Sequence, residues 1–160
     1  MSYLGAISVI IGVYMIWREY SRFVDREYEI CRAFLLAITD YREKVRCYME
    51  SPREWALGYE DECLLQNGFL PALRDGADFT VAYGEARRDI CTTKSVDGIL
   101  TACFTRLGEG YLEAELDTLD IAIGKLSCEE AGCAERLTKR RKATGALLGA
   151  FALGTVILII

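Results

Sequence analysis

Two uncharged, apolar stretches flank a strongly charged middle region of the chain. Residues 1–17 and 143–160 contain no Asp, Glu, Lys or Arg, and all 43 charged residues lie between Arg18 and Lys142 (19 basic and 24 acidic). A helix of 17 residues is roughly 26 Å long, close to the hydrocarbon thickness of a bilayer. The alternative is a pair of buried core helices, but a small domain rarely buries a helix that is apolar on every face. The pattern therefore predicts transmembrane helices at 1–17 and 143–160, around a domain at 18–142.

Basic residues gather beside both uncharged stretches and indicate the orientation of the chain. Lys and Arg near membrane helices stay on the cytoplasmic side. The first stretch lacks the basic start and the small-residue cleavage site of a signal peptide. We expect residues 18–142 to be cytoplasmic and both ends to lie outside; binding of anionic lipid headgroups is a second use for the basic run. The expected topology anchors are Arg18, Arg22, Arg26, Lys139, Arg140, Arg141 and Lys142.

The second uncharged stretch carries a G-x-x-x-G spacing at Gly145 and Gly149. Small residues at this spacing let another membrane helix approach closely. The first stretch is the expected packing partner, through Gly5 or Gly12.

Two stripes of apolar residues run through the charged middle region in steps of three and four, the second with one gap. Such steps place side chains on one face of a helix, so each stripe predicts a long amphipathic helix. We expect an all-α fold in which these two helices pack antiparallel and continue into the terminal transmembrane helices. The first stripe is Cys31, Phe34, Ile38, Tyr41, Val45 and Tyr48; the second is Leu112, Leu116, Leu119, Ile123, Leu126, Cys133 and Leu137.

Shorter helices are predicted between the two stripes, where they would form a cap at the far end. Ser51 and Glu54 have the spacing of a capping box and Pro52 suits a first turn, so a helix is expected over 52–66, ending at Asn67–Gly68. Within 69–76 we expect about one turn of helix, after Pro71. Helices are also expected over 79–91, capped by Asp78, and over 94–107, with Thr93 or Ser95 near its start. Gly108 and Gly110 mark a tight corner before the second stripe.

Composition narrows the classes of function. The net charge is −5 and no basic stripe alternates with aromatics, so nucleic-acid binding is not expected. Seven cysteines without a C-x-x-C pair, in a chain without histidine, fit neither a zinc site nor a closed disulfide framework. We expect reduced thiols that serve as small buried side chains in the cytosol, and no metal or cofactor.

No catalytic constellation stands out in the sequence. The lack of histidine removes Ser-His and Cys-His nucleophile systems, and no phosphate-binding glycine motif is present. Acidic residues at 113, 115, 117 and 120 could bind a cation but are more typical of a solvated helix face. Cys128 and Cys133 could serve a redox role, although helix packing is the simpler interpretation. We therefore expect a scaffold or adaptor rather than an enzyme, with no small-molecule substrate.

The layout of the whole chain and the motifs of its last third resemble the stage III sporulation protein AB family. The similar stretches are Leu107–Gly108–Glu109–Gly110, the leucine-stepped helix after it, and the basic residue followed by a glycine-spaced apolar helix at 142–149. Where the family has a glycine–aspartate turn and then a glutamine, this chain has Tyr111–Leu112–Glu113–Ala114.

The resemblance implies a platform-like subunit of a channel complex around the developing endospore. Members sit in the membrane on the mother-cell side, the outer forespore membrane. Their expected partners are a cytoplasmic secretion-type ATPase, encoded beside them, and other membrane subunits of the channel. The alternative is a membrane-tethered adaptor or regulator unrelated to sporulation.

Overall fold

The computed structural model describes residues 2–90, 92–108 and 111–159, and every regular element in these ranges is an α-helix. Over most of the two terminal stretches it describes the backbone but few of the side chains. The predicted all-α class is confirmed. The helices are α1 (Ser2–Tyr48), α2 (Pro52–Gly58), α3 (Glu62–Gln66), α4 (Phe69–Arg74), α5 (Phe79–Ala86), α6 (Lys94–Phe104) and α7 (Leu112–Ile159).

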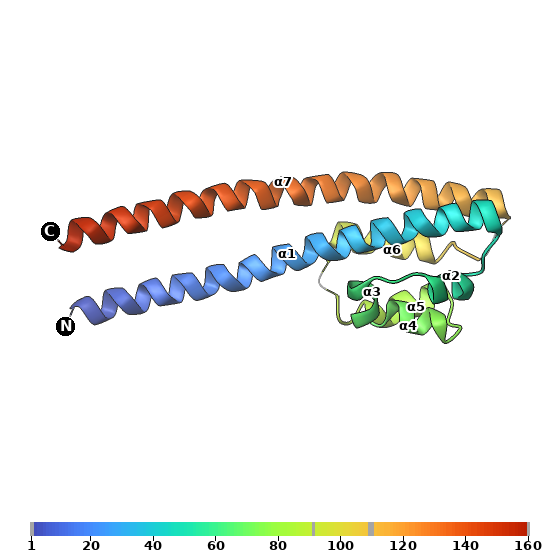
Figure 1. Ribbon diagram of the computed structural model, residues 1–160, viewed down its shortest axis with the longest axis horizontal. Helices are drawn as coiled ribbons and strands as arrows, with labels where there is room; N and C mark the ends of the chain where they lie inside the picture. Colours follow the sequence, from blue (N-terminus) through green and yellow to red (C-terminus); the bar gives the residue numbers. More distant parts are fainter. Residues whose placement is uncertain (1, 91, 109–110, 160) are drawn as a thin grey trace.

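The helices α1 and α7 form an antiparallel pair that runs along the whole molecule (Figure 1). They contain 47 and 48 residues, so each is about 70 Å long. The start of α1 and the end of α7 lie together at one end, here called the proximal end; the opposite end is the distal end (Figure 1). The predicted pairing of two long helices is confirmed.

The two predicted stripes form the buried faces of this pair. Every residue of the first stripe is buried except Tyr48, which is the last residue of α1 and is exposed at the distal end. In the second stripe Leu119, Leu126 and Cys133 are buried and the other four residues are half-buried. Burial of each large apolar side chain contributes about 1.5–3 kcal/mol, so these faces stabilise the packing of the two long helices on each other and on the short helices.

The two uncharged stretches belong to the proximal parts of α1 and α7. Among the described residues, no helix combines the length and the apolar character needed to cross a membrane. The predicted packing through Gly145 and Gly149 and the side chain of Arg141 lie outside what the structure describes.

The five short helices lie against one side of the distal half of the pair (Figure 1). The predicted cap is thus at the expected end, but it packs beside the pair rather than across its tip. An aromatic core joins it to α1, because the ring of Phe34 contacts those of Phe69, Tyr83 and Phe104 at centroid distances of 5.1, 5.7 and 6.1 Å. Edge-to-face and tilted rings at these distances add to the stabilisation from burial.

The single helix predicted over 52–66 is wrong, because the chain forms α2 and α3 with a break between them. The predicted capping box is present: Glu54 N–H donates to Ser51 Oγ and Ser51 N–H donates to Glu54 Oε2. The break is held by Arg74, whose guanidinium donates to the carbonyls of Ala56 (2.8 Å) and Tyr59 (2.9 Å). Asp61 then accepts from Leu64 N–H and starts α3. Side-chain partners for these terminal backbone groups replace the hydrogen bonds of a continuous helix.

The other short helices differ from the prediction mainly at their ends. Helix α4 begins two residues before Pro71, and α5 and α6 end earlier than expected, at Ala86 and Phe104. The predicted cap of α5 by Asp78 is confirmed. Thr93 caps α6, whereas Ser95 donates to Glu129 of α7 at 2.5 Å.

The aromatic core yields a test of what holds the cap to the pair. Phe34→Ala should lower the free energy of unfolding by about 3–5 kcal/mol, because it opens a cavity where three aromatic rings meet. Leu36→Ala, an exposed position on the same helix, should change it by no more than about 0.5 kcal/mol. Urea unfolding of the full chain, followed by circular dichroism, measures both; equal effects of the two variants would contradict the assignment of the core.

Candidate functional site

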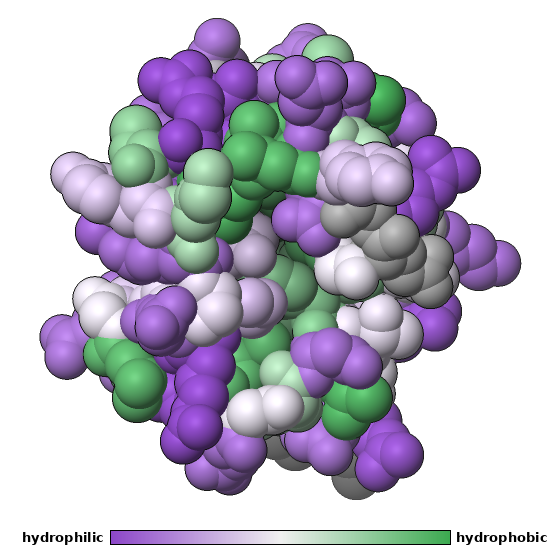
Figure 2. Space-filling model, turned by 90° about the vertical axis from the view of Figure 1, so that its right-hand side faces the viewer, coloured by the Kyte–Doolittle hydropathy of each residue, from purple (hydrophilic) through white to green (hydrophobic). Residues whose placement is uncertain are grey.

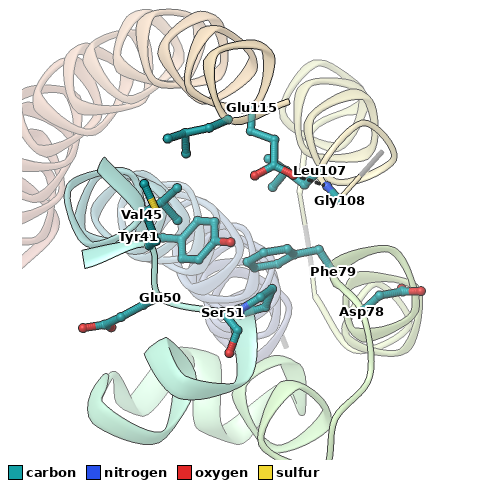
Figure 3. A pocket seen from close by; sticks show the side chains of 12 residues that line it. Tyr41, Val45, Glu50, Ser51, Asp78, Phe79, Leu107, Gly108 and Glu115 are labelled. Atoms are coloured by element: carbon teal, nitrogen blue, oxygen red, sulfur yellow. Dashed lines mark hydrogen bonds between the residues drawn. The ribbon is translucent and has the colours of Figure 1, made fainter. Parts of the chain in front are cut away.

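A pocket of about 380 Å³ opens at the distal end, where the end of α1, the start of α5 and the corner between α6 and α7 meet. Figure 2 views this end and shows apolar surface at the bottom of a hollow that hydrophilic side chains frame. Figure 3 shows the lining side chains converging from these segments. The apolar part of the lining consists of Val45, Met49, Pro52, Phe79, Leu107 and Leu112.

The polar side chains of this distal pocket are those of Tyr41, Ser51 and three acidic residues, and the Ser51 hydroxyl is already bonded to Glu54. Tyr41 is only 5% exposed, and its hydroxyl has no hydrogen-bond partner among the described residues. Figure 3 shows that hydroxyl directed toward the middle of the ring of lining side chains. Burial, and next the nearby charge of Glu115, raises the pKa of Tyr41 above its usual range, so the phenol stays protonated. Glu50 and Asp78 are the other two acidic groups in the lining, and none of the described lining residues is basic.

Two backbone positions shape the mouth of the distal pocket. Met49 has φ 53°, and no other non-glycine residue of the described ranges has a positive φ. This conformation costs about 1–3 kcal/mol and persists only where the surrounding structure enforces it. Gly108 has φ 88°, and its N–H donates to Glu115 Oε1 at 2.8 Å. The predicted corner at Gly108 is thus confirmed; Gly110 lies outside the described residues.

A wider hollow of about 740 Å³ lies along α1 between the distal and proximal ends, beside α3. Its lining mixes Arg26 and Arg32 with Glu29, Asp61 and Glu62. With Asp89, four acidic side chains stand beside two basic ones, so the lining carries a net negative charge.

A buried polar cluster connects α1 to α7 nearer the proximal end. Glu27 is 5% exposed, and its Oε1 accepts from Arg136 at 3.3 Å and from the thiol of Cys133 at 3.6 Å. Arg136 also donates to Cys133 Sγ at 3.0 Å. A buried carboxylate without a partner is costly, so this cluster selects the one register of the pair that satisfies it.

The described cysteines are free thiols and do not gather at a metal site. All six that the structure describes are free, and no group of metal-ligating residues comes together within the described ranges. Burial raises the pKa of Cys31 and of Cys103 to about 12, which keeps both thiols protonated and unreactive at neutral pH. The expectation of buried thiols is wrong for Cys47 and Cys128, which are exposed.

The acidic residues at the start of α7 have separate roles. Glu115 caps the corner through Gly108, and Asp120 pairs with Arg42 of α1, with oxygen–nitrogen distances of 2.5 and 3.0 Å. Glu113 and Asp117 are exposed, as expected for a solvated face.

The predicted topology anchors lie on both helices of the pair. Arg22 pairs with Glu19 (3.7 Å) and Lys139 with Glu135 (2.8 Å). All the anchors whose side chains are described are exposed except Arg140, which is half-buried. The contact of Glu27 with Cys133 and Arg136 fixes the register. About one to two and a half turns further toward the proximal end, α1 reaches 18–22 and α7 reaches 139–142. The two basic groups therefore lie at one level of the pair, here called the basic level.

The sequence prediction missed the distal pocket. Tyr41 and Val45 belong to the first stripe and cannot be told from core residues by periodicity. The signal that was available is the corner at Gly108, which the glycines of 107–110 mark. The pocket arises because segments more than 60 residues apart meet there.

The chain matches no model of a known protein family, and no curated protein or solved structure matches it either. The resemblance of its last third to the stage III sporulation protein AB family therefore stays a prediction. The distal pocket and the basic level are the two features from which we infer a function.

The buried cluster predicts a specific loss of stability. Glu27→Gln keeps the shape of the side chain but removes the charge that faces Arg136, whose side chain is 53% exposed. Because water screens part of this pair, we expect a loss of about 1–2 kcal/mol in the free energy of unfolding. Glu29→Gln, an exposed position on the same helix, is the matched control and should have little effect.

Chemical denaturation of the full chain measures both variants. A double-mutant cycle with Arg136→Gln should show positive coupling between the two positions. Additive effects would mean that the pair does not interact in solution.

Proposed function

We propose that this chain is a non-enzymatic membrane scaffold whose helical domain, residues 18–142, faces the cytoplasm. Its uncharged stretches, 1–17 and 143–160, would be the transmembrane helices that anchor it. The distal end would then project away from the membrane, where it can dock a soluble partner.

The observation that carries this proposal is the basic level. The antiparallel pair brings Arg18 and Arg22 to the same height as Lys139 and Lys142, and beyond that height both helices are uncharged. A ring of Lys and Arg beside uncharged helices is typical of the cytoplasmic surface of a bilayer. In a purely water-exposed rod there is no reason for charges to stop at the same height on both helices.

The particular role that we propose is a platform subunit of a sporulation-specific, secretion-like channel complex. The resemblance of residues 107–149 supports this choice, and so do the two anchors that it shares with that family's layout. In this role the chain sits in the outer forespore membrane, docks a cytoplasmic secretion-type ATPase and organises other membrane subunits. The competing proposal is a membrane-tethered adaptor outside sporulation, which the same anchors would serve.

The topology can be tested with reporters on the full chain. A reporter that is active only outside the cytoplasm should be active when fused after Ile160 and inactive when inserted at the exposed turn beside Gly76. A reporter that fluoresces only in the cytoplasm should give the opposite result. The chain should also sediment with membranes and need detergent for release. Recovery in the high-speed supernatant without detergent would overturn the membrane proposal.

The docking role can be tested by capture of the ATPase. The detergent-solubilised full chain should retain the purified secretion-type ATPase encoded beside its gene, and should not retain an unrelated helicase-type ATPase. Equal recovery of the two ATPases, or none of either, would favour the adaptor outside sporulation. A neighbouring gene for such an ATPase, with several genes for small membrane proteins, would favour the channel complex.

A further inference from the structure

We propose that the distal pocket binds the side chain of an arginine carried by a segment of a partner protein. Three features of the pocket point to this ligand: apolar walls, a tyrosine hydroxyl that faces the pocket with no partner among the described side chains, and carboxylates in the lining. That the arginine belongs to a protein follows from the proposed docking function. The preference for a guanidinium does not, because it follows from the pocket alone.

The walls fit the aliphatic stem of an arginine. Val45 and Leu112 come from the two long helices, Phe79 comes from the cap, and Leu107 comes from the corner between α6 and α7. Long basic side chains bury their methylene groups against such surfaces while the charged head finds polar partners. Phe79 and Tyr41 contact each other edge to face at a centroid distance of 4.8 Å.

The polar groups suit the head of the same side chain. The hydroxyl of Tyr41 can accept one guanidinium N–H without giving up an existing hydrogen bond. Glu115 uses Oε1 for Gly108 and has its second oxygen left. The carboxylate of Glu50 is directed away from the middle of the pocket (Figure 3) and lies 3.8 Å from Lys44, so it would act through its charge at the mouth. Arginine presents five donors in a rigid fork, so it can satisfy the hydroxyl and a carboxylate together.

The charge around the pocket is complementary to such a ligand. From Leu107 to Gly124 the chain has five acidic residues and no Lys or Arg, and of those five Asp120 is already paired. Exposed apolar side chains at Tyr48, Met49 and Tyr111 lie at the neighbouring ends of α1 and α7. A partner segment with an arginine between apolar residues would match both properties.

Methyl-labelled methionine provides a direct readout. The chain has three methionines, and only Met49 lines the pocket, whereas Met1 and Met15 lie in the first uncharged stretch. The full chain in detergent micelles, with ¹³C at the methionine methyl groups, is titrated with N-acetyl-arginine-N-methylamide. The Met49 signal should shift and saturate in the low millimolar range while the Met15 signal does not move. N-acetyl-citrulline-N-methylamide, which has nearly the same shape without the charge, should bind at least fivefold more weakly.

Variants separate the contributions of the hydroxyl and the carboxylates. Tyr41→Phe should weaken binding by about threefold to tenfold, because it removes one hydrogen bond and keeps the ring. Glu50→Gln should weaken it by a similar factor and should reduce its dependence on salt. Glu60→Gln changes the net charge equally, lies outside the pocket lining and should leave the affinity unchanged. Unchanged circular dichroism of all three variants excludes misfolding as the cause.

Each outcome either supports or overturns the inference. Equal binding of the arginine and citrulline amides, or binding that Tyr41→Phe and Glu50→Gln leave unchanged, would overturn it. Free arginine binding at least tenfold more tightly than the amide would also overturn it, since the occupant would then be a metabolite. If the arginine amide binds but the ATPase is not captured, the pocket stands and the proposed function fails. If the ATPase is captured but the amide does not bind, docking uses another surface.

Discussion

The structure depends on the fixed register between α1 and α7. Three contacts set it along the pair: Arg42 with Asp120 near the distal end, the thiol of Cys31 with the carbonyl of Leu126 (3.9 Å), and the buried cluster at Glu27. A slip of one helical turn would leave the carboxylate of Glu27 buried and unpaired, which is why this polar group discriminates between registers that apolar packing alone would nearly equate. The cap, the distal pocket and the basic level all take their positions from this alignment.

The aromatic core gives the distal pocket a rigid floor. Phe79 stacks on Phe104 at a centroid distance of 5.4 Å and meets Tyr41 edge to face, so one side of each pocket aromatic is fixed by the core. Trp55 adds a further contact to Tyr41 and donates from Nε1 to Asp40 at 2.7 Å. A side chain that enters such a preformed site loses little free energy to rearrangement of the protein. The strained backbone of Met49 lies at the rim, where strain is commonly retained for a function.

The long helices were predictable from the sequence because each is encoded by a stripe that is local and periodic. The caps at Ser51, Asp78 and Thr93 were also local signals. The break between α2 and α3 was not predictable in this way, since the group that holds it, Arg74, comes from a helix further along the chain. The distal pocket was missed for the same reason. In the apolar stripe Tyr41 looks like any core residue, and only the assembled fold shows that its hydroxyl faces a pocket.

The antiparallel pairing of the first and last helices affects how the chain folds during synthesis. Helix α1 is made first and α7 last, and Glu27 meets Arg136 only after 109 further residues have been added. Contacts at such sequence separation form late in folding, so the apolar face of α1 has to wait for its long partner. The cap helices, made in between, can cover the distal part of that face early through Phe34. The unfinished protein is therefore most open to aggregation around Glu27 and Cys31, which meet their partners on α7 only when that helix is complete.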